Sequence, residues 1–167
     1  NKRPLTLEMS YTKAAQLGDP TLLSIYASHW LVNETGLPLE YFDMSPGAGG
    51  AQPANHECRQ WLEPEPFLWS FKKGPAEKHG KFAIGLSGKP EGKGVSLSQP
   101  EQCQHIQVKT PKLRKGQQRY RHTIVCYVTL GSGRFRRTKI VYMRHLYHII
   151  NETNSLLAIK STDGVNE

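Results

Sequence analysis

The most restrictive feature of the sequence is a tripeptide that occurs twice in the same apolar setting. Asn33-Glu34-Thr35 follows two apolar residues, and so does the second copy, which starts at Asn151. The asparagines lie 118 positions apart (151 − 33). The same offset aligns further pairs: Leu22-Leu23 with Ile140-Val141, Leu39 with Leu157, and Leu7 and Met9 with Val125 and Tyr127. This period exceeds the ~20–50 residues of solenoid repeats and matches a whole β-sandwich. The recurrence therefore predicts tandem, domain-sized β modules.

The local pattern predicts β-strands nearly throughout. Leu5, Leu7, Met9 and Tyr11 alternate at period two, which is typical of a strand with one apolar face. The clearest hairpin joins 121–130 to 134–143 through a glycine-containing loop at 131–133. Other expected strands are 21–32, 37–42, 66–72, 81–88 and 105–110. The segment Ser45–Glu57 is rich in Gly, Pro and Ala, so we expect a mobile surface loop there.

The expected fold class is all-β, with tandem antiparallel modules that resemble β-sandwiches. Residues 1–20 would end one repeat, 21–138 would form one nearly complete repeat, and 139–167 would open the next. The chain is 37% apolar and 22% charged, which is ordinary for a soluble globular protein, and no apolar run approaches the ~18 residues of a membrane helix. It lacks a first methionine and a signal-peptide core, so we expect a piece of a longer chain. Its three cysteines favour a reducing compartment.

Each Asn-Glu-Thr is expected to form a joint between two strands. An asparagine side chain can bond to backbone groups a residue or two further on, and it thereby mimics a turn. Gly36 and Asn154 follow the two asparagines by three positions, and these residue types most readily take positive φ. An N-x-T triplet is also a glycosylation acceptor, but glycosylation does not require the repeated frame. The pattern therefore favours a structural joint at Asn33 and Asn151.

A net charge of +8 at pH 7 fits an anionic partner. Two basic groups flank the expected hairpin, and its pairing would bring them close together. They comprise Lys109, Lys112, Arg114, Lys115, Arg119 and Arg121 in the first, and Arg134, Arg136, Arg137 and Lys139 in the second. Such a patch can bind phosphoinositide or other anionic lipid, or it can be a solvated edge that discourages aggregation. Nucleic acid is not expected as a partner, because few aromatic residues are interleaved with the basic ones.

No catalytic motif is readable, so we expect a protein that is not an enzyme and needs no cofactor. His56-x-Cys58 and Cys103-x-His105 each place two ligand types on one face of a strand, an arrangement that two pairs can use to hold zinc. Four unrelated side chains are the alternative, and structural zinc sites usually have wider spacing. We therefore expect no metal.

The frame of the joint resembles the adaptor-binding repeats of the vacuolar protein sorting-associated protein 13 family of bridge-like lipid transfer proteins. "SHWLVNETGLPLEYFD" resembles the opening of one repeat, and "GRFRRTKIVYMRHLYHIINET" resembles one repeat running into the next. The second joint reads "NETNSLLAI" and lacks the Gly-Leu-Pro-Leu of the first. The resemblance implies a non-catalytic module that binds short proline-x-proline segments of adaptors and so recruits the lipid transfer protein to organelles. The repeat asparagines, here Asn33 and Asn151, would be needed for this work.

The resemblance also implies a cytoplasmic protein peripheral to Golgi or endosomal membranes, nearest within the family to the Golgi-associated B paralogue. Aromatic side chains that can receive prolines, or simply pack in the core, are Trp30, Trp61, Trp69, Tyr120 and Tyr127. Pro64-Glu65-Pro66 is either an internal copy of the adaptor motif or an edge segment before a strand. Two other functions stay open, namely an anionic-lipid-binding module and a structural spacer repeat.

Overall fold

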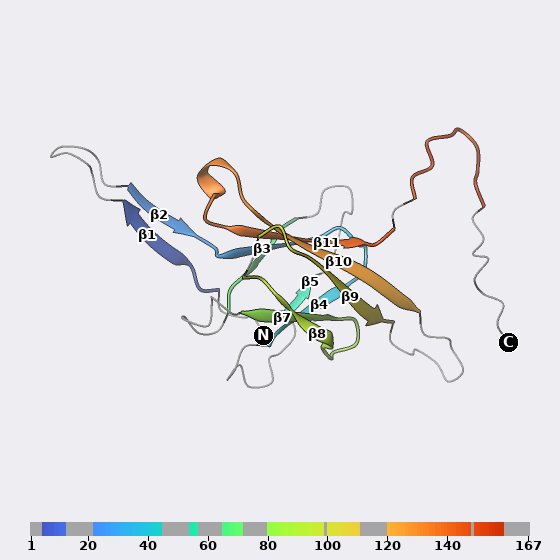
Figure 1. Cartoon of the computed structure of the whole chain (residues 1–167), viewed down its shortest axis with the longest axis horizontal. Coiled ribbons are helices and arrows are strands. Elements are labelled where there is room, and N and C mark those ends of the chain that lie inside the picture. The colour runs from blue at the N-terminus through green and yellow to red at the C-terminus, as the bar shows by residue number, and fades with distance from the viewer. Residues whose placement is uncertain are drawn as a thin grey trace.

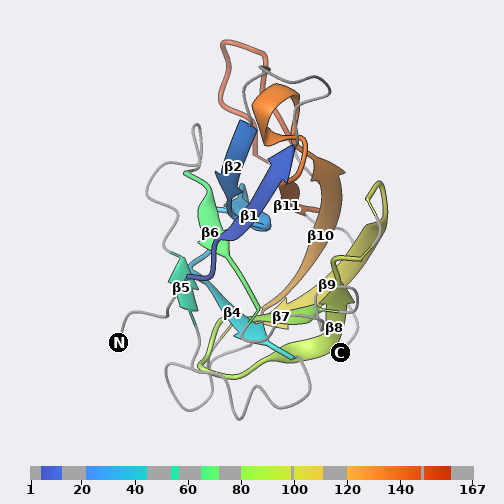
Figure 2. The ribbon, with the colours of Figure 1, turned by 90° about the vertical axis from the view of Figure 1, so that its left-hand side faces the viewer.

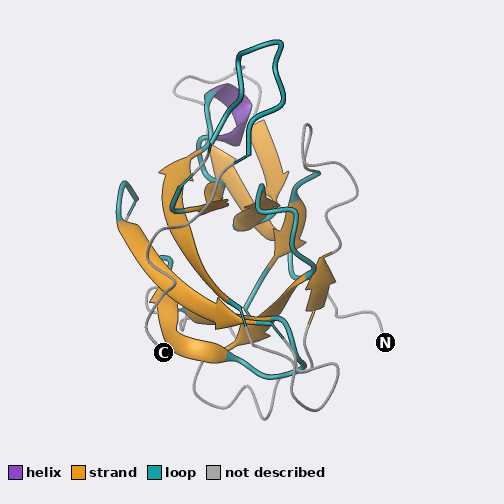
Figure 3. Ribbon diagram, turned by 90° about the vertical axis from the view of Figure 1, so that its right-hand side faces the viewer, coloured by secondary structure: helices purple, strands orange, loops and turns teal. Residues whose placement is uncertain are grey.

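The structure, a computed structural model, describes residues 5–12, 22–44, 54–56, 65–71, 80–98, 100–110, 120–147 and 149–158, and of 54–56 only the backbone. The described part is all-β apart from one 3₁₀ turn, η2 (Gly133–Phe135) (Figures 1 and 3). The strands are β1 (Glu8–Thr12), β2 (Leu22–Tyr26), β3 (His29–Asn33), β4 (Leu39–Asp43), β5 (Ala54–His56), β6 (Phe67–Trp69), β7 (Lys81–Gly85), β8 (Glu91–Ser96), β9 (Cys103–Lys109), β10 (Arg121–Leu130) and β11 (Lys139–His145). In these residues no helix has the length and apolar character needed to cross a membrane.

Two sheets enclose one hydrophobic core (Figure 2). The larger sheet has the order β6-β3-β11-β10-β9 and the smaller one β5-β4-β7-β8. Neighbouring strands run antiparallel except β11 and β3, which are parallel. Tyr41 and Phe82 of the smaller sheet meet Trp69 of the larger one at ring-centroid distances of 6.2 and 6.5 Å. All three side chains are almost fully buried, so truncating any of them would cost ~3–5 kcal/mol.

The alternation that predicted the strands is the alternation of burial. Along β10, Ile124, Cys126 and Val128 are fully buried, whereas the residues between them are wholly or partly exposed. β9 continues the pattern with Ile106 and Val108. The predicted all-β class and the hairpin of β10 with β11 are therefore confirmed.

Three local predictions need correction. The segment 21–32 forms two strands in different sheets, because the chain breaks at Ala27-Ser28, where the carbonyls accept hydrogen bonds from Thr138 Oγ1 and the Lys139 N–H, both at 2.9 Å. β5 lies inside the segment expected to be a loop, where it pairs with β4. β8 was not expected, because its glycines interrupt any apolar alternation.

The predicted hairpin is also shorter on its second side than expected. Residues 134–138 form η2 and a turn rather than strand, and β11 begins only at Lys139, opposite Leu130. The expected module boundary at 138/139 therefore falls inside this hairpin. β11 pairs with both β10 and β3, and the division into repeats remains a prediction.

β1 and β2 form a separate two-stranded sheet, which projects from one side of the sandwich (Figure 1). Met9, Tyr11, Leu22, Leu23 and Ile25 of this sheet are all more than half exposed, whereas most of the large apolar side chains of the other two sheets are buried. At its base the N–H of Thr6 donates to Ser70 Oγ at 2.9 Å.

Candidate functional site: the asparagine joints

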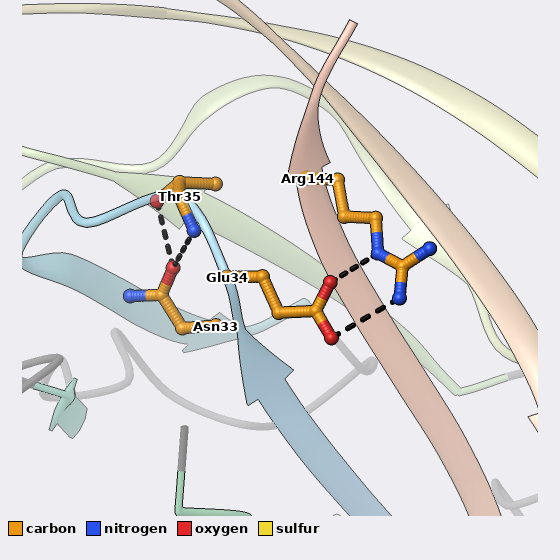
Figure 4. A network of polar contacts seen from close by, with 4 residues as sticks. All are labelled: Asn33, Glu34, Thr35 and Arg144. Atoms are coloured by element: carbon orange, nitrogen blue, oxygen red, sulfur yellow. Dashed lines mark hydrogen bonds and ion pairs between the residues drawn. The ribbon is translucent and has the colours of Figure 1, made fainter. Parts of the chain in front are cut away.

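Asn33 ends β3 and organises the turn that follows. Its side chain is fully buried. Its Oδ1 accepts hydrogen bonds from the N–H and the hydroxyl of Thr35, at 3.0 and 2.7 Å (Figure 4). Its Nδ2 donates to the carbonyl of Leu37 at 2.8 Å. Thr35 Oγ1 in turn accepts from the Leu37 N–H at 3.1 Å. The chain can reverse here because Gly36 takes φ +70°, a conformation that glycine adopts without strain.

Two successive residues of this joint, Glu34 and Thr35, are tied to three successive residues of β11. The backbone N–H of Glu34 donates to the carbonyl of Met143 at 2.9 Å. The Glu34 carboxylate forms a two-pronged ion pair with the guanidinium of Arg144 (Figure 4). His145 Nε2 donates to the carbonyl of Thr35 at 2.9 Å, which assigns the proton to that nitrogen. The turn is therefore fastened both within itself and to the parallel neighbour of β3.

The charges at this joint are modestly coupled. The hydrogen bond that Arg144 donates to the Glu34 carboxylate raises the pKa of Arg144, so the guanidinium stays charged. The Arg144 side chain is exposed, and such pairs contribute less than about 1 kcal/mol. Near the pair, the rings of His122 and His145 lie 5.8 Å apart. Burial, and secondarily His145, lowers the pKa of His122.

The second joint has the same internal hydrogen bonds as the first. Asn151 Oδ1 accepts from the N–H and hydroxyl of Thr153 at 3.0 and 2.7 Å, and Asn151 Nδ2 donates to the carbonyl of Ser155 at 2.9 Å. All of these residues are exposed, and no strand flanks them in the described part. The expected left-handed residue is present at Gly36 but not at Asn154, so the second joint keeps its side-chain bonds without it.

The two asparagines differ in burial, which decides whether each can accept a glycan: Asn33 is buried and Asn151 is exposed. A glycan attaches to the side-chain nitrogen of asparagine, and in Asn33 that atom is buried and donates to Leu37. The sequon interpretation is therefore wrong for Asn33.

The basic residues do not gather as expected. Arg121 begins β10, whereas Arg134, Arg136 and Arg137 follow its far end, about 30 Å away along an extended strand. The expectation of one combined patch is therefore wrong for these residues. Lys109 pairs with Arg121 at the near end.

The remaining basic residues have other positions. Lys139 Nζ donates to the carbonyls of Leu97 and Ser98 at 2.8 and 3.3 Å, so it links β11 to the segment that follows β8. Lys112, Arg114, Lys115 and Arg119 lie outside the described residues.

The candidate metal and aromatic residues are likewise dispersed. Cys103 and His105 are exposed on β9, while Cys58 and the side chain of His56 lie outside the described part. Among the described side chains, no three of His, Cys, Asp or Glu are grouped closely enough to hold a metal ion.

The aromatic candidates divide between the core and the surface. Trp69 packs in the core, and Trp30 is half-buried against Phe135, with ring centroids 4.8 Å apart. Tyr120 and Tyr127 are exposed, so core packing is wrong for them. Trp61 and Pro64 lie outside the described part, and the exposed Pro66 immediately precedes β6, at the edge of the larger sheet.

The described residues thus define a class: a β-sandwich module whose polar network holds a turn in place. Within this class, the chain matches the sequence family described as Vacuolar-sorting associated protein 13, adaptor binding domain, over residues 1–166. The chain therefore belongs to this family, and it is a non-catalytic adaptor-binding module. A comparison with curated proteins found no match.

Sequence reasoning found both asparagines but missed their partners. Arg144 and His145 lie 110 positions from Glu34 and Thr35, and no local pattern connects them. The one available signal was the threonine that follows each asparagine by two residues, Thr35 in the first copy of the frame and Thr153 in the second.

Proposed function

We propose that this chain recruits a lipid transfer protein to an organelle surface by binding a proline-x-proline segment of an adaptor. The family match over nearly the whole chain carries the proposal. The sandwich also ends in strands that suit such a ligand: β6 and β9 border the larger sheet, and β5 and β8 the smaller one.

Strand addition explains why alternate prolines suit a sheet edge. In a β-strand, successive residues direct their N–H groups to opposite edges, so two prolines at alternate positions leave the same edge without donors. The residue between them keeps its N–H and C=O on the other edge and can pair with the domain. The bound peptide then presents an outer edge that a further strand cannot extend.

The joint asparagine acts in this proposal by positioning. Asn33 is buried and uses both its oxygen and its nitrogen inside its own turn. Its loss would release the link between β3 and β4, which belong to different sheets. Adaptor binding would then fall in proportion to the folded fraction.

The test is fluorescence polarisation with a labelled proline-x-proline adaptor peptide and a control peptide in which both prolines are alanine. We expect saturable binding of the first peptide alone, and little change with added salt. Asn33→Ser should weaken binding only as far as circular dichroism shows unfolding. Loss of binding by a fully folded Asn33→Ser variant would instead mean direct contact, and absence of wild-type binding would refute adaptor capture by this chain.

A second candidate function is contact with anionic membrane through the turn at η2. Arg134, Arg136 and Arg137 are exposed there, and none forms an ion pair with a residue that the structure describes. Each would contribute about 1 kcal/mol at an anionic surface. Flotation with phosphatidylserine vesicles should then be lost in the triple Arg→Gln variant and at high salt. If neither vesicles nor peptide bind the folded chain, the spacer role remains.

Within the family, we propose the Golgi-associated B paralogue and a location on Golgi or endosomal membranes. Fluorescence microscopy of the tagged chain in cells, with organelle markers, tests this assignment. Accumulation on another organelle would reject it.

A further inference from the structure

Side-chain hydrogen bonds close one of the two open sides of the sandwich. Figure 2 shows β8 and β9 along one side and β5 and β6 along the other. On the first side, the Gln104 amide accepts from the N–H of Ser96 at 3.1 Å and donates to its carbonyl at 2.8 Å. The Glu91 carboxylate accepts from the N–H of Lys109. These bonds occupy backbone groups of both β8 and β9, so an added strand is expected on the side of β5 and β6.

The backbone direction of β3 is set by its bonds to β11. The N–H of Glu34 donates to β11, and the carbonyl of Ser28 accepts from the first residue of β11, both at 2.9 Å. Successive residues of a strand direct their backbone groups to opposite edges. The even-numbered residues of β3 therefore face β11, and the odd-numbered ones, His29 and Leu31, face β6.

The same alternation then orients β6. His29 pairs with Trp69 and Leu31 pairs with Phe67, so Phe67 and Trp69 direct their backbone groups toward β3. Leu68 lies between them and directs its N–H and its C=O to the open edge. β6 thus offers one donor and one acceptor, both from the same residue.

The residues on either side of Leu68 limit this edge. Pro66, just before β6, is exposed and has no N–H to donate. Just after β6, Ser70 Oγ accepts from the N–H of Thr6 at 2.9 Å, so the segment before β1 lies beside it. The Leu68 side chain is 41% exposed and stands next to the half-buried Trp30 of β3. The edge is therefore short, and an apolar surface adjoins it.

We infer that Leu68 pairs antiparallel with the middle residue of the adaptor's proline-x-proline segment, an inference that rests on the proposed function. In such a pair the N–H of residue x donates to the carbonyl of Leu68, and the N–H of Leu68 donates to the carbonyl of x. The prolines on either side direct their backbones away from β6, where no donor is needed. An edge with one residue to offer thus matches a ligand with one residue able to pair.

This register also predicts which ligands bind best. Paired residues of neighbouring strands share a face of the sheet, so the side chain of x lies beside Leu68 and near Trp30. The two prolines lie on the other face, opposite Phe67 and Trp69, and one of them covers the exposed part of the half-buried Phe67. An apolar residue at x is therefore favoured over a charged one, because a charge would lose water against this surface.

β5 is the competing edge on the same side of the sandwich. By the same alternation its middle residue, Asn55, directs its backbone groups outward. Asn55 pairs with Glu40, whereas Leu68 pairs with Trp30. The apolar neighbour favours β6 for a ligand of prolines and an apolar residue.

Proline substitutions in the full 167-residue chain test the edge from the side of the domain. Leu68→Pro removes the outward N–H and keeps the groups that pair with β3, and proline is tolerated on an edge strand. Gln107→Pro is the matched control, since Gln107 directs its N–H outward on β9 as Lys109 does two residues on. Asn55→Pro tests β5. In fluorescence polarisation with the labelled peptide, we expect Leu68→Pro to weaken binding about tenfold or more and the other two to leave it unchanged.

A modified peptide tests the same pair without any change to the domain. Methylation of the backbone nitrogen of x removes the donor to Leu68 and should also weaken binding about tenfold or more. Valine at x should bind more tightly than aspartate. Hydrogen exchange of the Leu68 amide should slow when the unmodified peptide binds, and this measurement decides the matter if Leu68→Pro does not fold.

The outcomes separate this edge from the proposed function itself. Wild type that binds no proline-x-proline peptide refutes both. Tight binding by a folded Leu68→Pro variant, or of the methylated peptide, overturns the pairing with Leu68 and leaves adaptor capture standing. A loss in Asn55→Pro alone assigns the ligand to β5, and a loss in Gln107→Pro alone assigns it to β9.

Discussion

Asn33 and Asn151 offer a matched pair of substitutions, because their local hydrogen bonds are the same and their surroundings differ. In each joint the asparagine oxygen accepts from a threonine N–H and hydroxyl, and its nitrogen donates to a carbonyl four residues on. Asn33 is fully buried and Asn151 is exposed. Replacing each asparagine by alanine therefore measures how much burial adds to the contribution of these hydrogen bonds to the free energy of unfolding.

The structure sets the expected difference. Asn33→Ala leaves the buried Thr35 N–H without its acceptor, at ~1–3 kcal/mol, and the half-buried Leu37 carbonyl without its donor, at a smaller cost because water can reach it. We expect a loss of about 3 kcal/mol in the free energy of unfolding. Water replaces the same bonds at Asn151, so Asn151→Ala should cost about 0.5 kcal/mol or less.

Urea denaturation followed by circular dichroism measures both values, with equal slopes as the condition for comparing them. For a domain of this size the Asn33 variant should also melt about 6–12 °C lower. Equal losses in the two variants would refute the reasoning, because burial would then not matter. An Asn33 variant as stable as wild type would show that the fold does not depend on this turn.

Three further predictions concern single groups near the joint and the β2–β3 link. Burial lowers the pKa of His29 to about 4, below its unfolded value of about 6.5. The fold therefore has its full stability above pH ~6.5, where the ring is neutral in both states, and up to about 3 kcal/mol of the free energy of unfolding is lost as the pH falls toward 4. His29→Phe should remove this part of the pH dependence of the urea midpoint. Arg144→Gln should cost less than about 1 kcal/mol, and Glu34→Gln a similar amount, with both losses shrinking in high salt when unfolding is followed in a salt series. Gly36→Ala should lower the free energy of unfolding by about 1 kcal/mol in the same assay, because alanine is strained in the left-handed conformation that Gly36 adopts. A clash adds nothing to this cost, since the new methyl group would meet no atom within 4 Å.

The strands were predictable where burial alternates, and less so where other contacts decide. β4, β7, β9 and β10 have apolar residues that recur in short β-rich runs, and each was expected within a few residues. The break between β2 and β3 was not, since the continuous run from Leu22 to Val32 shows no breaker. It is set by Thr138 and Lys139, which are far away in the sequence.

The candidate site divides in the same way. The turn at Asn33 is encoded within five residues, and its recurrence at Asn151 with identical bonds shows that it forms without a neighbouring strand. Its attachment to Arg144 and His145 depends on the parallel pairing of β3 with β11, which one sequence does not reveal. Local chemistry predicted the joint, and only the sheet order identified its partners.

This division bears on how the asparagines serve adaptor binding. If the joint forms locally but is buried only when a hairpin lies beside it, its stability depends on the contact between β3 and a β11-type strand. A change at Asn33 then weakens the link between the two sheets, whereas the same change at Asn151 has little effect until a hairpin covers that joint. Asparagine substitutions should therefore reduce adaptor binding most where the joint is buried, and the loss should follow the folded fraction. An Asn151 variant that fails to bind peptide while Asn33 variants still bind would reverse this order and assign direct contact to the exposed joint.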